Sequence, residues 1–140
     1  MSLKTVAWIS GVYDLALAIA MLFFASRTAA LFGAPPPVPL VNAQLNGVFT
    51  LALAAGYFWA AGEVEQRRGY FWIAGVLAKG LGAALFVVDY LRGNSPASFL
   101  LFALSDGALA LLTLGLLLRR PAAGRVSTPE PRPASGTPRG

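Results

Sequence analysis

Four long apolar stretches alternate with short polar connections along the chain. The stretches cover about residues 5–25, 41–61, 70–91 and 98–118. Each approaches or exceeds the roughly 20 residues that a helix needs to cross the hydrocarbon core of a bilayer. None shows the polar–apolar alternation of barrel strands, and only helices or closed barrels satisfy their backbone hydrogen bonds in lipid. The pattern therefore predicts an all-α fold, an integral membrane four-helix bundle with up-down-up-down topology.

The connections carry residues that end helices. The prolines Pro35 to Pro37 follow the first stretch and favour an extended connection. A charged loop at residues 63–68 and a turn at residues 92–96 separate the later stretches. Residues 121–140 contain five prolines and no aromatic residue. We therefore expect one four-helix transmembrane domain at residues 1–120 and a disordered, Pro/Arg-rich cytoplasmic tail at residues 121–140.

The basic residues predict an orientation. Lys4, Arg67, Arg68 and the arginines from position 119 onward would share one side of the membrane, whereas Arg27 and Arg92 would lie on the other. Cytoplasmic loops carry the excess of Lys and Arg, so both termini are expected in the cytoplasm. An interfacial belt of aromatic residues is expected on that same side, formed by Trp8, Tyr57, Trp59, Tyr70 and Trp72.

Composition narrows the function classes. The chain is 56% hydrophobic and 12% charged, whereas soluble domains carry roughly 25% charged residues. The net charge of +5 is not a nucleic-acid footprint, because the basic residues gather at predicted helix ends. The absence of Cys and His excludes disulfides, thiol chemistry, the common zinc sites and histidine-activated nucleophiles. We expect no cofactor, no metal and no catalytic residue, which favours a non-enzymatic protein over an enzyme.

Three ionisable residues, Asp14, Lys79 and Asp106, lie near the middle of apolar stretches. Each costs about 2.5–3.5 kcal/mol at the centre of a bilayer, so such side chains usually face a bundle interior. Their positions place them within roughly 5 Å of one another in depth. Small residues that allow close helix packing share their faces: Ala7, Gly11 and Ala18 with Asp14, Gly75, Gly82 and Ala83 with Lys79, and Ala103, Ala110 and Thr113 with Asp106.

These three residues are the candidates for a ligand- or proton-binding site at the bundle centre. One positive and two negative charges are present, and burial beside a like charge favours a neutral carboxyl. We therefore expect either Asp14 or Asp106 to carry a proton. The alternative interpretation is a purely structural ion pair that fixes the register of the helices.

Further polar residues lie near the outer half of the predicted bundle. One hypothesis is a polar funnel that leads from the outer side toward the centre. The alternative, which the residue types favour, is that these residues cap helix ends at the membrane interface. The secondary candidates are Tyr13, Asn42, Gln44, Asn46 and Asp89.

Several segments together give the chain a family resemblance. They are Val12–Leu17, the loop Leu31–Pro37, Asn46–Gly47, the loop Glu63–Arg68, and Asp106. Over roughly residues 5–119 the chain resembles small four-span bacterial membrane proteins described as DoxX-like or as uncharacterised integral membrane proteins. The resemblance implies the fold and a multi-pass location in the bacterial inner (cytoplasmic) membrane. It implies no particular activity, and Lys79 matches no functional residue of that group.

Three functional hypotheses follow. The leading one is a non-enzymatic inner-membrane protein whose Asp/Lys/Asp cluster binds a small or lipid-like ligand or fixes helix packing in a membrane subunit. The second is a proton-coupled small transporter, although the positive charge of Lys79 opposes cation binding near Asp14. The third is a membrane isomerase resembling the EXPERA type, in which buried carboxyls move protons. The expected partners are the lipid bilayer, a second copy in a homodimer or another membrane protein, and no nucleic acid.

Overall fold

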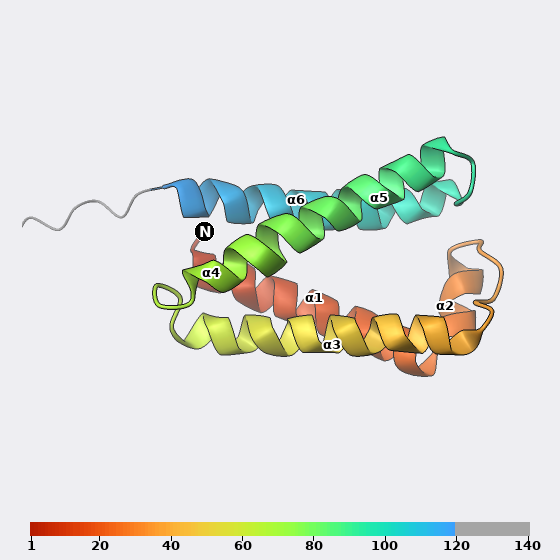
Figure 1. The fold of residues 1–140 in the computed structure, drawn as a ribbon, viewed down its shortest axis with the longest axis horizontal. Helices are drawn as coiled ribbons and strands as arrows, with labels where there is room; N and C mark the ends of the chain where they lie inside the picture. Colours follow the sequence, from red (N-terminus) through yellow and green to blue (C-terminus); the bar gives the residue numbers. More distant parts are fainter. Residues whose placement is uncertain (120–140) are drawn as a thin grey trace, which may run out of the picture.

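The computed structural model describes residues 1–119, and the tail predicted at residues 121–140 lies outside the described residues. The described part is helical, without strands (Figure 1). Four helices are long and apolar enough to cross a membrane: Leu3–Phe23, Leu40–Gly62, Arg68–Leu91 and Ala97–Leu118. These bounds agree with the predicted stretches to within two residues. The prediction of an all-helical protein with four helices long and apolar enough to cross a membrane is therefore confirmed, and the topology in the membrane stays a prediction.

Two of the four spans are divided into shorter helical elements. The first and second spans are α1 (Leu3–Phe23) and α3 (Leu40–Gly62). The third contains α4 (Arg68–Tyr70), the π-helix η1 (Phe71–Ala78) and α5 (Lys79–Leu91). The fourth contains the 3₁₀ turn η2 (Ala97–Phe99) and α6 (Leu100–Leu118).

Successive long helices run in alternating directions, and the N-terminus lies at the same end of the molecule as the end of α6 (Figure 1). In each span, only 22–33% of the residues in an apolar stretch of 18 are buried within the molecule. The outward faces carry large apolar side chains such as Leu85, Leu104 and Leu111, which are 68%, 70% and 71% exposed. Such faces suit contact with lipid. The side of the membrane on which the termini lie stays a prediction.

Two helical hairpins build the fold. α1 packs along α3, and α5 packs along α6, whereas α3 and α5 make almost no direct contact. Close packing depends on small residues: a Cβ atom on Gly47 of α3 would lie 2.9 Å from Leu22 Cγ of α1. A Cβ atom on Gly75 of η1 would lie 2.7 Å from Thr113 Cγ2 of α6. Backbones approach closely at such positions, as is typical of helix contacts in membranes.

The apolar core lies at one end of the bundle, which we call the closed end. Tyr57 and Phe71 are fully buried there, between the start of α1 and the end of α6. The assignment of Tyr57 to the interfacial belt is therefore wrong, because its ring packs against Phe71 and Tyr70 inside the bundle. Trp8, Trp59 and Trp72 are exposed, so their place in a belt stays a prediction. The core consists of Leu3, Ala7, Tyr57, Ala60, Ala61, Phe71, Ala74 and Leu117.

Two features of the fold were not predicted from the sequence. The first is α2 (Ala25–Leu31), a short helix in the connection between α1 and α3. The chain becomes extended only after Gly33, whose φ of +70° suits glycine. The second is the π-helix η1, which runs directly into Lys79. π-helical segments are rare and occur frequently at functional sites.

Candidate functional site

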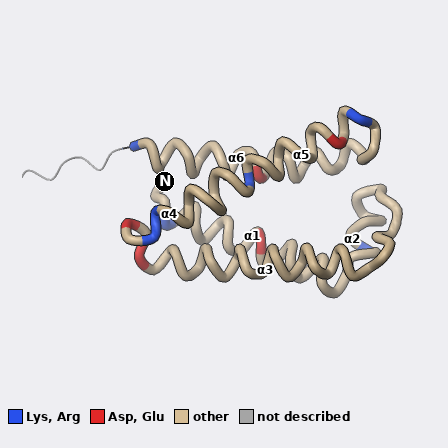
Figure 2. Tube along the Cα trace, in the orientation of Figure 1, with Lys and Arg blue, Asp and Glu red and all other residues tan. Residues whose placement is uncertain are grey.

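The three charged residues of the apolar stretches meet inside the bundle, and we call them the triad. Lys79 Nζ donates to Asp14 Oδ1 at 2.7 Å and to Asp106 Oδ1 at 3.0 Å. Asp14 and Lys79 are buried, with only 2% and 6% of each residue exposed. Figure 2 shows charged residues near the middle of the spans, apart from the charges at the two ends of the molecule, and Lys79 lies near the middle of the third span, where η1 meets α5. The expected meeting of the three side chains is therefore confirmed.

The small residues around the triad explain why its side chains point inward. Gly11 and Ala18 are buried on the face of α1 that carries Asp14, and Gly75 is buried on the face of Lys79. Residues three or four positions apart share a helix face, so these positions bring the neighbouring backbones close to the charged side chains. The predicted companions of Asp106 are also buried: Ala103, Ala110 and Thr113.

The two carboxylates differ in their surroundings. The side chain of Asp14 is 3% exposed and that of Asp106 is 16% exposed. Asp14 Oδ2 is buried without a hydrogen-bond partner, and so are Ser10 Oγ and Tyr57 Oη. Unpaired buried oxygens are uncommon and often mark a place for water or a ligand. Asp14 is thus the enclosed member of the triad, and Asp106 is the accessible one.

Tyr13 lies beside the triad, as its neighbouring sequence position suggested. Its ring centroid is 4.8 Å from Lys79 Nζ, a distance at which a cation is attracted to an aromatic face. The hydroxyl groups of Tyr13 and Ser105 are 2.8 Å apart. Ser105 was not among the predicted candidates, although it precedes Asp106 directly. The contact links α1 to α6 next to the ion pairs.

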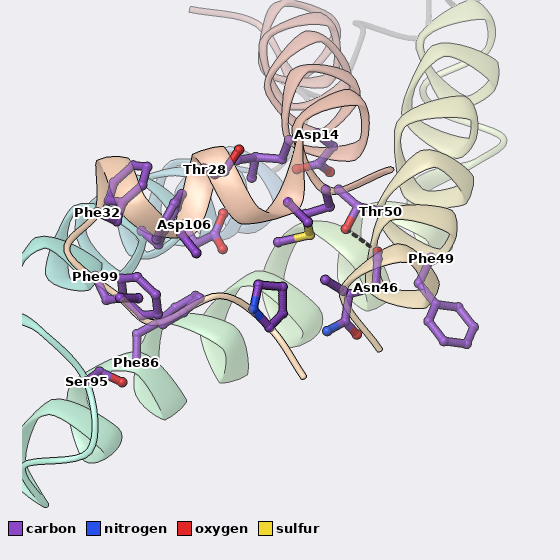
Figure 3. Close-up of a pocket in the computed structure, with 18 of the residues that line it drawn as sticks. Asp14, Thr28, Phe32, Asn46, Phe49, Thr50, Phe86, Ser95, Phe99 and Asp106 are labelled. Atoms are coloured by element: carbon purple, nitrogen blue, oxygen red, sulfur yellow. Dashed lines mark hydrogen bonds between the residues drawn. The ribbon is translucent and has the colours of Figure 1, made fainter. Parts of the chain in front are cut away.

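A cavity of about 620 Å³ lies between the two hairpins, with the triad at its inner end (Figure 3). We call it the interhairpin cavity. Its lining is mostly apolar, and its only charged residues in the described part of the chain are those of the triad. Residues of α2 and of the proline loop line it toward the other end of the bundle, including Thr28, Phe32 and Pro35. The short helix that the sequence did not predict is therefore part of the cavity wall.

Four phenylalanine rings form one wall of the cavity. The ring of Phe102 lies 4.7 Å from that of Phe32 and 5.5 Å from that of Phe86, measured between centroids. Phe99 packs edge-on against Phe86 at 6.0 Å. Phe102 precedes Asp106 by one turn of α6, so the aromatic wall adjoins the accessible carboxylate. The clustering was not predicted, because it brings together residues of α5, η2 and α6 and the residue that follows α2.

The secondary candidates Asn42, Gln44, Asn46 and Asp89 lie at different places in the structure, and only one of them lines the cavity. Asn46 lines the cavity, and its backbone carbonyl accepts a hydrogen bond from Thr50 Oγ1 at 2.8 Å. Asn42 is exposed, and Gln44 borders a different pocket together with Arg27. Asp89 accepts hydrogen bonds from Asn94, at 3.1 Å, and from Ser95, which closes the turn after α5. Asn46 is thus the outer-half candidate placed at the cavity, and Asp89 acts as a turn cap.

The described residues hold no cluster of three or more His, Cys, Asp or Glu side chains able to bind a metal ion. What the cavity offers instead is one accessible carboxylate, a few amide and hydroxyl groups, and a large apolar surface. That combination can orient the polar end of a molecule whose remainder is apolar.

Comparison with protein-family models, with curated proteins and with solved structures finds no match to this chain. The resemblance to DoxX-like proteins is therefore an expectation from the sequence, and the function has to be argued from the site itself.

Proposed function

We propose that the protein is a non-enzymatic, multi-pass binding protein of the bacterial inner membrane that holds a small amphiphile in the interhairpin cavity. The observation that carries this proposal is the combination of a largely apolar cavity with a charged triad at its inner end. The polar group of the ligand lies at the triad, and its apolar body lies along the phenylalanine wall.

The dimensions of the cavity support a small-molecule ligand. Ligand sites in proteins typically measure roughly 300–1,000 Å³, and this cavity measures about 620 Å³. Such sites combine apolar walls with a few well-placed polar groups, as here. A triad that served helix register alone would need no open space beside it.

The arrangement of the helices supports access from the lipid. Because α3 and α5 make almost no contact, the two hairpins separate on that side of the bundle. Phe49 of α3 and Phe86 of α5 both line the cavity, and Phe49 is 60% exposed. A ligand dissolved in the bilayer could therefore pass between these helices without crossing a polar barrier.

The closed end favours binding over transport. Beyond the triad, Tyr57, Phe71 and Leu117 are buried in the apolar core, so apolar side chains fill that end of the bundle in the described part of the chain. A transporter needs access from both sides of the membrane in turn. The proposal therefore places the ligand in a one-sided cavity.

Binding to the full chain in phosphatidylcholine nanodiscs tests the proposal. The probes are dodecylamine, dodecanol and dodecanoic acid, and native mass spectrometry counts bound molecules against empty nanodiscs. The variant Ala78→Phe adds a ring to the cavity lining beside Lys79, whereas Ala55→Phe adds the same ring to a position that is equally classed as exposed but is not part of the lining.

We expect saturable binding of at least one probe to the wild type and to Ala55→Phe. Ala78→Phe should lower the affinity at least tenfold, because the ring occupies the volume that the ligand needs. No saturable binding of any probe, or equal binding to the two variants, would refute a ligand site in the cavity.

A further inference from the structure

Charge and hydrogen bonding at the triad select the chemical class of the ligand's polar group. We propose that this group is a protonated amine, held by Asp106 and facing the phenylalanine wall, so that the ligand is a lipophilic cation. The inference rests on the proposed function, since it names the ligand class of the same cavity.

The charge balance is the first argument. The charged lining consists of two carboxylates and one ammonium group, which leaves one negative charge in excess. A proton on one carboxyl would neutralise this charge, and a bound ammonium group would neutralise it equally. An anionic ligand would instead add to the excess in a setting of low dielectric constant.

The free hydrogen-bonding capacity of the triad is the second argument. Lys79 Nζ is nearly enclosed and already donates to both carboxylates, so it offers little to an anion. Lys79 donates a hydrogen bond to Asp106 Oδ1, and Asp106 Oδ2 accepts none from the described residues. Asp14 Oδ2, buried at the inner end of the cavity, also lacks a partner. Apart from the third N–H of Lys79, whose ammonium group lies 4.8 Å from the centroid of the Tyr13 ring, the unused capacity consists of acceptors, which require a donor from the ligand.

The position of the two carboxylates decides where the amine lies. Asp14 is enclosed between Lys79 and the core, and the positive charge of Lys79 opposes a second cation there. Asp106 is the more exposed carboxylate, and Figure 3 shows it among the labelled residues of the cavity wall near Phe32 and Phe99. A cation at Asp106 Oδ2 therefore has a direct approach from the cavity.

The phenylalanine wall is the third argument. A ring face attracts a cation within roughly 6 Å of its centroid, and the attraction grows when water is excluded. Phe102 lies one turn from Asp106, and its ring packs against those of Phe32 and Phe86. The wall therefore suits both the charge and the apolar body of a lipophilic amine.

A comparison of equal chain lengths tests this class. The full chain in phosphatidylcholine nanodiscs is titrated with dodecylamine, dodecanol and dodecanoic acid, which differ only in their polar group. We expect dodecylamine to bind at least tenfold more tightly than either of the others. Equal or tighter binding of dodecanol or dodecanoic acid would overturn the amine assignment but leave the cavity as a ligand site. No binding of any probe would overturn the proposed function itself.

Two substitutions separate the contributions of charge and ring. Asp106→Asn should weaken dodecylamine binding roughly 10- to 100-fold, the usual loss for a charge-assisted hydrogen bond. Glu65→Gln makes the same change in the exposed loop at the closed end and should leave binding unaltered. If Asp106→Asn does not fold, the comparison of the three probes on the wild-type protein still decides the question.

Phe102→Leu keeps an apolar side chain but removes the ring face. It should weaken dodecylamine binding roughly 2- to 30-fold while dodecanol binding stays the same. Phe23→Leu, at a position 73% exposed and outside the lining, is the matched control. Equal losses for both probes in Phe102→Leu would contradict a cation at this wall.

The amine can come from a free molecule or from a lipid head group. Nanodiscs in which phosphatidylethanolamine replaces phosphatidylcholine distinguish these sources, because phosphatidylethanolamine presents a primary ammonium group and phosphatidylcholine does not. Displacement of dodecylamine by phosphatidylethanolamine assigns the cavity to the lipid, and unchanged dodecylamine binding assigns it to a free amine.

Discussion

Replacing Lys79 by methionine should strongly destabilise the protein, because it leaves two carboxylates facing each other inside the bundle. Lys79 Nζ makes ion pairs of 2.7 and 3.0 Å, and only 6% of the lysine side chain is exposed. Removal of one partner from a buried ion pair typically costs about 3–5 kcal/mol, since an uncompensated charge is left behind. We expect a loss of that size for Lys79→Met.

The triple variant Asp14→Leu/Lys79→Met/Asp106→Leu removes all three charges while it keeps the approximate volumes. Buried ion pairs exchanged for well-packed apolar residues of similar volume are often neutral or stabilising, so the triple variant should lie within about 1 kcal/mol of the wild type. Lys4→Met removes an exposed lysine and should change stability by no more than about 0.5 kcal/mol.

Reversible unfolding in mixed micelles, followed by circular dichroism, measures these free energies. Destabilisation of Lys79→Met by less than about 1 kcal/mol would refute the reasoning, because it would mean that the carboxylates do not depend on the lysine. A triple variant as unstable as Lys79→Met would equally refute it, since the loss would then come from packing and not from unpaired charge.

Three further predictions concern packing, polarity and orientation. Gly75→Ala should cost about 1–3 kcal/mol in the same unfolding assay, because the new Cβ would lie 2.7 Å from Thr113 Cγ2, and Thr113→Ser should restore much of the loss. Tyr57→Phe should leave stability within about 1 kcal/mol of the wild type, because the hydroxyl that it removes has no hydrogen-bond partner within 3.5 Å; a larger loss would reveal that Ser10 or a bound water pairs with it. The chain lacks cysteine, so single cysteines report orientation cleanly: in intact spheroplasts, an impermeant thiol reagent should label Arg92→Cys and spare Lys4→Cys, and the reverse pattern would invert the predicted topology.

The sequence predicted the spans and the inward direction of the triad for clear physical reasons. The length of an apolar stretch determines whether a helix can cross the bilayer. A charged residue in the middle of such a stretch must avoid lipid, and small residues at helical spacing around Asp14 and Lys79 mark the face that it takes. These are properties of single helices, so one sequence suffices to predict them.

The cavity could not be predicted in the same way. It depends on the separation of α3 from α5 and on the position of α2, which are properties of helix packing and leave no periodic signal. The phenylalanine wall has the same origin, because Phe32, Phe86 and Phe102 come from different parts of the chain. Tyr57 was assigned wrongly because a tyrosine close to a span end resembles an interfacial anchor. It lies on the face of α3 that packs into the core.

The structure also bears on whether the triad serves only to fix helix register. One pair, Lys79 with Asp14, already joins α5 to α1 and is almost completely enclosed. Asp106 adds a second carboxyl that is more exposed and lies beside an open cavity, so the triad has two carboxyls for one ammonium group. An ion pair that only fixes helix register gains nothing from the second carboxyl, because a further buried charge, or the proton that neutralises it, raises the cost of folding. In the proposed function this carboxyl receives a positively charged group, so Asp106 is the residue whose properties favour that proposal over a purely structural role.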